Sequence, residues 1–226
     1  IDLPEFDAFW AEGLVDLTPH DGPFTMLADF VADPAAHPLD TPSGRIEIFS
    51  QAIDGFGLAD CPGHPAWLDK DEWLGAPLTE RFPLHLVTDQ PERRLHSQLD
   101  ASPHSRAGKV EGREQVHMNP ADMARRGIAD GTVVLLRNDR GRCLAVARAN
   151  PLVMEGVARL NTGAWYDPDP ETGMDRHGNP NVLTADRPAS GLSQGCAAQS
   201  CLVDIEPWTG PLPPVQAFDL PEFAPR

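Results

Sequence analysis

Hydrophobic and polar positions are patterned most regularly in the middle of the chain. Residues 84–88 form a short apolar run, and residues 132–137 and 142–148 are rich in β-branched and aliphatic side chains. The two later runs flank residues 138–141, whose sequence Asn-Asp-Arg-Gly is typical of a turn. Apolar runs bounded by turn residues indicate strands, so this part predicts a hairpin. A further strand is expected over residues 157–161.

The stretch from Asn119 to Gly127 has the start and stop signals of a short helix. Asn119 is a good N-cap and Pro120 suits the first helical position. Arg125 lies near the expected C-terminus, where a positive charge interacts favourably with the helix dipole. Gly127 can adopt the left-handed conformation that ends many helices. A short helix therefore interrupts the strand series.

The N-terminal part, residues 1–80, has weaker patterning. Aromatic residues spaced about one helical turn apart predict helical turns near residues 4–10, and residues 25–32 look similar. Residues 45–49 alternate between polar and apolar side chains, as a half-buried strand does. No continuous apolar core is visible here. We expect an arm of loops and short helices, or the remnant of a preceding domain.

The distribution of proline locates the packed centre. The chain contains 24 prolines, about twice the ordinary share of roughly 5%. None lies between Asp122 and Asn150. Proline lacks the amide proton that a sheet or a helix interior needs, so this stretch should be the best-ordered part of the fold.

A strand, a short helix, a hairpin and further strands, with few long helices, predict a compact, mainly β barrel. A closing strand is expected over residues 196–205. We therefore expect three parts: an N-terminal arm or remnant over residues 1–80, a barrel over residues 81–206, and an extended proline-rich tail over residues 207–226.

Charge and hydropathy exclude several classes of partner. The formal net charge is −16 at pH 7, which repels the phosphates of nucleic acids and the head groups of anionic lipids. No apolar stretch approaches the roughly 18 residues that a membrane helix requires. We expect a soluble protein that neither binds nucleic acid nor inserts into a membrane.

Familiar catalytic motifs are missing from the sequence. There is no G-x-S-x-G nucleophile elbow, no G-x-G-x-x-G dinucleotide motif and no P-loop. The four cysteines form no C-x-x-C pair and the histidines show no zinc-ligand spacing. The residues therefore indicate neither a catalytic group nor a metal ligand within this chain.

Two polar loops are the candidates for ligand binding. Residues 94–98 follow the first strand and gather donors of several geometries, although a solvated loop is an equally ordinary explanation. In the turn at residues 178–184, Asn179 and Asn181 can present carboxamides to a heterocycle. Asparagine beside glycine and proline is also ordinary turn chemistry.

Five stretches together resemble the C-terminal region of molybdopterin oxidoreductases, in the branch of dimethyl sulfoxide, trimethylamine N-oxide and biotin sulfoxide reductases. In chain order they are residues 41–50 (TPSGRIEIFS), 94–98 (RLHSQ), 138–141 (NDRG), 163–168 (GAWYDP) and 178–184 (GNPNVLT). The resemblance covers most of this chain and only the last part of such an enzyme.

The resemblance implies a fold and a cofactor. The fold would be a six-stranded double-psi β-barrel with short helices, together with the N-terminal loop and helix arm. The cofactor would be bis(molybdopterin guanine dinucleotide) molybdenum. Carried over residue by residue, the cofactor contacts would be Thr88, Arg94, His96, Ser97, Gln98, Asn179, Asn181, Gln194 and Gln199.

The resemblance also implies a function. The chain would be the cofactor-binding part of a reductase that takes oxygen from an S-oxide or N-oxide, and its partners would be the upstream domains of the same enzyme and that small substrate. It would carry no catalytic residue and no molybdenum ligand of its own. Related enzymes lie in the bacterial periplasm or cytoplasm. The alternative is a double-psi barrel without catalytic role that acts as an interaction module.

Overall fold

The computed structural model describes residues 3–17 and 23–220 of the chain. Its contacts divide the chain into two compact units. One unit consists of Ile1–Phe56 with Gly63–Pro65, and the other of Gly57–Pro62 with Ala66–Arg226. Each unit is considered by itself below.

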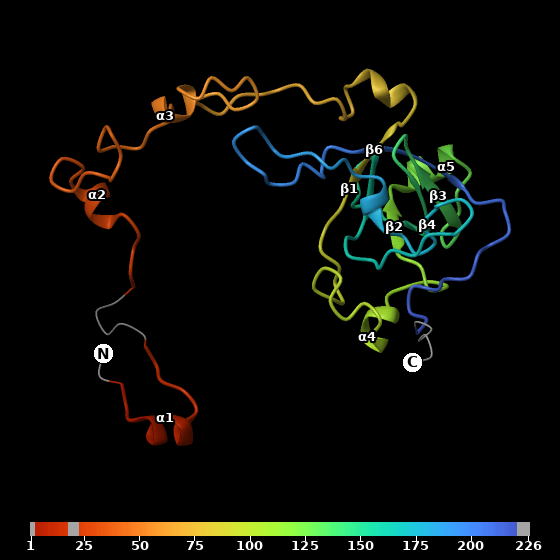
Figure 1. Cartoon of the computed structure of the whole chain (residues 1–226), viewed down its shortest axis with the longest axis horizontal. Coiled ribbons are helices and arrows are strands. Elements are labelled where there is room, and N and C mark those ends of the chain that lie inside the picture. The colour runs from red at the N-terminus through yellow and green to blue at the C-terminus, as the bar shows by residue number, and fades with distance from the viewer. Residues whose placement is uncertain (1–2, 18–22, 221–226) are drawn as a thin grey trace, which may run out of the picture. The chain divides into compact units, whose positions relative to one another are not determined.

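Short helices and loops make up the described part of the first unit (Figure 1). They are α1 (Phe6–Glu12), α2 (Ala28–Ala32) and α3 (Gln51–Asp54), and none of them contains a buried residue. The helices expected near residues 4–10 and 25–32 are confirmed. The strand expected over residues 45–49 is wrong, because this described segment is irregular and its isoleucines are exposed to 71% and 80%.

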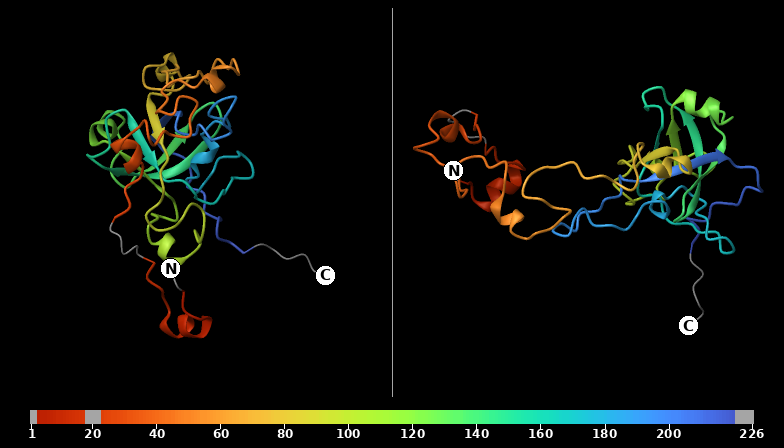
Figure 2. Two further views of the ribbon diagram at one scale, coloured as in Figure 1. Left: turned by 90° about the vertical axis from the view of Figure 1, so that its left-hand side faces the viewer. Right: turned by 90° about the horizontal axis from the view of Figure 1, so that it is seen from above.

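Six strands of the second unit close into a barrel, so the expectation of a mainly β fold with few short helices is confirmed (Figures 1 and 2). Around the barrel the strand order is β1-β5-β2-β4-β3-β6. The double-psi connectivity stays a prediction. The strands are β1 (Leu84–Val87), β2 (Gln115–Met118), β3 (Val133–Arg137), β4 (Arg142–Ala149), β5 (Val157–Leu160) and β6 (Leu202–Pro207).

Two of the six strand pairs are parallel and four are antiparallel, and this arrangement places the loops. Strand β1 runs parallel to β5, and β2 runs parallel to β4. The β3 and β4 strands form the predicted hairpin, in which Leu136 pairs with Cys143. Because β1 and β5 are parallel neighbours, the loops that follow them leave the barrel at the same end.

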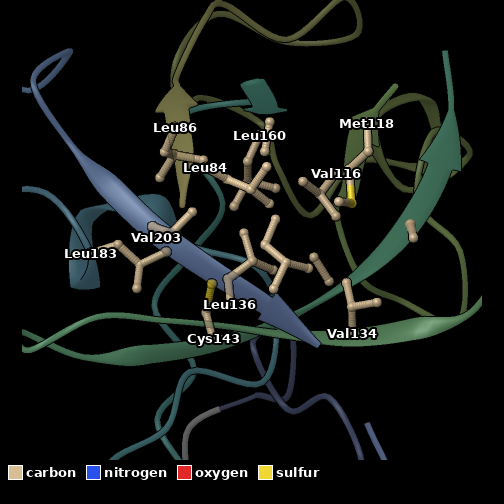
Figure 3. Close-up of a cluster of buried hydrophobic side chains, with 14 of the residues drawn as sticks. Leu84, Leu86, Val116, Met118, Val134, Leu136, Cys143, Leu160, Leu183 and Val203 are labelled. Atoms are coloured by element: carbon tan, nitrogen blue, oxygen red, sulfur yellow. The ribbon is translucent and has the colours of Figure 1, made fainter. Parts of the chain in front are cut away.

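The barrel is filled by aliphatic side chains that alternate with outward-facing residues. Leu84 and Leu86 of β1, Val116 and Met118 of β2, and Leu160 of β5 are at most 1% exposed. Figure 3 shows them converging with residues of β3, β4 and β6. This dry centre makes the barrel a rigid support for its loops.

Local signals account for α5 (Pro120–Arg125), as the sequence predicts. The Asn119 side chain accepts a hydrogen bond from the N–H of Ala121 at 2.9 Å, and Asn119 Nδ2 donates to the carbonyl of Val153 at 2.8 Å. Gly127 has the expected left-handed backbone. Neither this helix nor any other in the described residues is long and apolar enough to cross a membrane.

Two strand predictions need correction. Strand β2 lies in a stretch that the sequence indicated as a polar loop; four residues with only two apolar positions carry a weak signal. The closing strand begins at Leu202 rather than at residue 196. Residues before it have other partners, since Cys196 forms an isolated bridge with Pro188.

The segment before β1 is bound tightly to the barrel. Glu72 is 5% exposed and forms a bidentate ion pair with Arg140, at 2.6 and 2.8 Å. The same carboxylate accepts the N–H of Leu202 at 2.8 Å. Residues 66–83 thus cluster with the barrel. The boundaries after residues 80 and 206 stay predictions.

Candidate functional site

A surface pocket of about 450 Å³ lies where three loops of the second unit meet. The first loop follows β1, the second follows β5, and the third contains the Gly-Asn-Pro-Asn turn. The volume of the pocket is within the range of about 300–1,000 Å³ that is usual for small-molecule sites. The lining residues are His96, Ser97, Thr162, Gly163, Ala164, Trp165, Tyr166, Asn179 and Asn181.

The first loop is held in an unusual backbone conformation. His96 has a φ of 51°, in the left-handed region that few side chains adopt. Its N–H donates to Oε1 of Gln90 at 3.2 Å, and the amide nitrogen of Gln90 lies 2.9 Å from His96 Nδ1. The carbonyl of His96 accepts from Arg94 Nε at 3.0 Å. These contacts fix both the backbone and the ring of His96.

The second loop packs directly on the first. Gly163 has a φ of +86°, and a Cβ at this position would overlap the carbonyl group of His96 and crowd the backbone nitrogen of Ser97. Only glycine allows this close approach. Trp165 adds a hydrogen bond from its indole Nε1–H to the carbonyl of Ser97 at 2.9 Å. The two loops therefore form one wall.

The third loop is organised around a buried carboxylate. Asp175 Oδ1 accepts the backbone N–H groups of His177 at 3.1 Å, Gly178 at 2.7 Å and Asn179 at 2.8 Å. Asn179 in turn accepts the N–H of Asn181 at 2.9 Å and caps the short helix η2 (Pro180–Val182). The side chain of Asn179 thus performs the ordinary turn role and lines the pocket at the same time.

Neutral polar groups dominate the lining. None of the described residues that line the pocket is a lysine, an arginine or a carboxylate. Among the described residues, no partner accepts a hydrogen bond from Asn179 Nδ2, and the side chains of Ser97, Tyr166 and Asn181 also make no hydrogen bond. These donors and acceptors are therefore available to a polar ligand.

Charged groups lie buried beside the pocket instead. Arg94 and Lys109 contact Asp100 at 3.4 and 3.0 Å and also pair with Glu114, and all four side chains are at most 5% exposed. Burial by itself would raise the pKa of the Asp100 carboxyl, but the Lys109 ammonium and the further partners lower it below the ordinary value. Asp100 Oδ2 accepts the N–H of Trp165 at 3.1 Å. The cluster therefore anchors the wall of the pocket.

The same cluster does not suit a metal ion. Asp100, Glu114 and His177 have ligand atoms within 4.8 Å of one another. The ammonium of Lys109 already contacts both carboxylates and supplies the positive charge. Burial and Lys109 lower the pKa of His177, which favours the neutral ring. Its Nδ1 lies 2.8 Å from the carbonyl of Trp165, which can only accept a hydrogen bond. His177 is thus a structural link.

Four of the nine residues predicted to contact a cofactor meet in the pocket: His96, Ser97, Asn179 and Asn181. Two others bind each other. Gln199 accepts the N–H of Thr88 at 3.1 Å and donates to the carbonyl of Thr88 at 2.7 Å, so the side-chain amide extends the pairing of β1. Neither Thr88 nor Gln199 lines the pocket.

The other three predicted contacts also lie outside the lining. The side chain of Arg94 is 3% exposed, and its Nη2 donates to the carbonyl of Thr162 at 2.9 Å, so its guanidinium holds the two loops together. It also lines a separate polar cavity of about 280 Å³. Gln98 and Gln194 are exposed.

Sequence reasoning missed several residues that build the site. Gly163, Trp165 and Tyr166 line the pocket, although they belong to one of the five stretches that carried the resemblance. Asp175 and Gln90 do not line the pocket, but their hydrogen bonds hold the lining residues Asn179 and His96. No sequence signal distinguishes these two from other polar loop residues.

Comparison with known proteins identifies a family and several relatives. Residues 84–202 match the family model of the molydopterin dinucleotide binding domain. The chain is 48% identical over 209 residues to a biotin sulfoxide reductase of Cereibacter sphaeroides, covering 92% of the chain and 28% of that protein. It is 43% identical over 229 residues to a dimethyl sulfoxide/trimethylamine N-oxide reductase of Rhodobacter capsulatus, covering 99% and 28%.

A solved structure shares the fold. Acetylene hydratase from Pelobacter acetylenicus superposes with a TM-score of 0.63 at 19% identity, covering 78% of this chain and 25% of that chain. In all of these comparisons, the chain spans about a quarter of the length of the protein it matches.

Proposed function

The chain belongs to the molydopterin dinucleotide binding domain family, and on that premise we propose that it helps to hold bis(molybdopterin guanine dinucleotide) molybdenum in a larger reductase. The enzyme would reduce an S-oxide or an N-oxide, as the names of its relatives indicate for those proteins. This chain would be the C-terminal part, and the upstream domains of the same enzyme would be its partners.

The observation that carries the proposal is the neutral pocket. His96, Ser97, Asn179 and Asn181 come from loops more than 80 residues apart in the sequence and line one pocket. A pterin or a guanine base carries several neutral donors and acceptors, and each one left unpaired after burial costs about 1–3 kcal/mol. The free amide and hydroxyl groups of the lining suit such a heterocycle. The volume of the pocket is large enough for part of a dinucleotide.

Within this proposal four of the lining residues have a definite task. The carboxamides of Asn179 and Asn181 would bond the edge of a heterocycle, and Ser97 would bond a neighbouring polar atom. The indole of Trp165, 39% exposed, offers an apolar surface to a ring. When bound, the molybdenum centre would supply the oxygen-atom transfer chemistry, while this chain would bind and orient the cofactor and exclude water.

The five remaining predicted contacts are part of the same proposal. Thr88, Gln98, Gln194 and Gln199 would contact the cofactor once the upstream domains complete the site. Arg94 would support the loop that carries His96 and Ser97, because its guanidinium is bonded to the carbonyls of His96 and Thr162. A direct contact of Arg94 with a phosphate would require it to leave these partners.

The test uses the full-length protein purified with its cofactor. We compare Asn181→Ala and His96→Ala with the matched control Asn150→Ala, an asparagine that caps the N–H of Leu152 at 2.9 Å and lies outside this pocket. Molybdenum per protein is measured by elemental analysis, and guanine nucleotide is measured after acid release. We expect both quantities to fall in the pocket variants and to stay unchanged in the control.

The opposite result would favour the interaction module. If the unaltered full-length protein holds no guanine dinucleotide, the cofactor proposal fails. If it holds the cofactor and the pocket variants retain it fully, the cofactor lies elsewhere and the assignment of this pocket is wrong.

A further inference from the structure

The segment after β6, residues 208–220, contacts the loop that carries Trp165. Downstream of β6, the carbonyl of Pro213 contacts the guanidinium of Arg113, and the N–H of Gln216 donates to Asp167 Oδ2 at 2.8 Å. Asp167 follows Trp165 and Tyr166 of the lining. A segment expected to be only an extended tail is therefore bound to the loop that forms the wall of the pocket.

Phe218 is the aromatic anchor of this segment. Its ring lies edge to face against the ring of His177, with centroids 4.9 Å apart, and its centroid is 5.7 Å from the ring of Trp165. Two cations approach the same ring, Arg106 at 5.2 Å and Lys109 at 5.8 Å. Phe218 thus contacts the pocket wall and the buried charge cluster together.

The contact with His177 matters because His177 joins two loops. Its Nδ1 is 2.8 Å from the carbonyl of Trp165, and its backbone N–H is held by Asp175, which also holds Asn179. The ring of His177 is fully buried, and its Nε2 has no hydrogen-bond partner among the described residues. Removing the Phe218 ring would leave a void beside the His177 ring and weaken the link.

We propose that Phe218 is a positioning residue for the pocket, and that it fixes Trp165 and the Asn179 turn by packing on both His177 and Trp165. The effect of Phe218 on cofactor binding rests on the proposed function. The packing itself concerns only this chain. It can therefore be tested without any cofactor.

The first experiment measures hydrogen–deuterium exchange in the full-length protein prepared without cofactor. Phe218→Ala removes the ring, Phe218→Tyr preserves it, and Leu220→Ala is the matched control, since Leu220 is in the same segment and 88% exposed. We expect exchange in peptides covering residues 163–168 and 175–181 to accelerate about two- to tenfold in Phe218→Ala, the range that one aromatic pair is worth. Phe218→Tyr and Leu220→Ala should match the unaltered protein.

A second variant weakens the attachment of the segment while leaving the Phe218 side chain itself unaltered. Gln216→Pro removes the N–H that donates to Asp167, and we expect it to accelerate exchange in the same two peptides. Unchanged exchange in both Phe218→Ala and Gln216→Pro would overturn the proposal, whatever the protein binds.

The second experiment measures molybdenum content in protein prepared with cofactor. We expect a lower content for Phe218→Ala than for Phe218→Tyr and Leu220→Ala. If Phe218→Ala exchanges faster but keeps its full molybdenum content, Phe218 does not position the pocket for cofactor binding, and that part of the proposal is overturned. If even the unaltered protein holds no molybdenum, the proposed function fails, while the exchange experiment still decides whether Phe218 positions the loops.

Discussion

Asp175 Oδ1 lies 2.8 Å from the backbone nitrogen of Asn179, four residues further along the chain. The same oxygen accepts two more N–H groups, and Oδ2 accepts the N–H of Asp167 at 2.9 Å. Burial raises the pKa of Asp175, although these hydrogen bonds oppose the shift. One carboxylate therefore shapes the turn that presents Asn179 and also holds the loop of Trp165.

Replacing Asp175 should weaken both the fold and the pocket. Asp175→Ala leaves four N–H groups without their acceptor, and we expect the free energy of unfolding to fall by at least about 2 kcal/mol. Asp175→Asn keeps one carbonyl oxygen as acceptor and should cost less. Thermal or denaturant unfolding measures the effect, with the exposed Asp186→Asn as control. An Asp175→Ala protein as stable as this control would contradict the role of the carboxylate.

The close approach of Gly163 to the His96 carbonyl predicts a contrast between two glycines. Gly163 and Gly173 both have positive φ values, +86° and +67°, but a Cβ on Gly173 would meet nothing within 4 Å. Gly173→Ala should therefore cost only about 1 kcal/mol of conformational strain. Gly163→Ala must also push the two loops apart, so we expect a larger loss of stability and a low molybdenum content.

Equal behaviour of the two glycine variants would contradict this prediction. The measurements are unfolding midpoints and molybdenum per protein, taken side by side. Because both substitutions add the same methyl group at a left-handed position, the difference between them reports mainly the overlap with the backbone of His96 and Ser97.

The hydrogen bonds between the Gln199 side chain and the backbone of Thr88 predict that Gln199 stabilises the end of β1. Gln199→Ala removes the acceptor for the Thr88 N–H and the donor to its carbonyl, and should destabilise the end of β1 by about 1 kcal/mol. Gln194→Ala, a change to an exposed glutamine, serves as control. Exchange of the Thr88 amide should accelerate only in the first variant. If neither variant changes it, the pairing contributes no stability.

Glu72 predicts a dependence of stability on pH. Burial alone would raise the pKa of Glu72, but the bond to Arg140, with the Leu202 N–H, lowers it below 4.5. A carboxyl with a lowered pKa stabilises the folded state above its unfolded pKa, and this contribution is lost as the pH falls through the folded value. The advantage of the unaltered protein over Glu72→Gln should be full near pH 7 and shrink below about pH 4.5.

Unfolding midpoints measured between pH 7 and the acid limit test this prediction. Glu171→Gln, at an exposed glutamate, is the matched control and should show little difference from the unaltered protein at any pH. A Glu72→Gln difference that stays constant on acidification would show that the charge of Glu72 does not contribute.

Local patterns predicted those elements whose signals lie within a few neighbouring residues. Asn119, Pro120 and Gly127 mark α5 because capping depends on the adjacent backbone alone. The β3 and β4 hairpin follows from two long apolar runs around one turn. The two failures concern segments whose conformation depends on distant partners. Residues 45–49 alternate correctly yet form no strand, and β2 exists because β4 and β5 flank it.

The sequence by itself determined the mainly β barrel, its hairpin and helix, and two of the three loops that line the pocket. Only the tertiary structure decided which groups face a ligand. Arg94 was expected to contact the cofactor, but its guanidinium is bonded to the carbonyls of His96 and Thr162. Phe218 was part of an unremarkable tail and packs on His177. The partners of these residues are contributed by distant segments, and only the closing of the barrel brings those segments together.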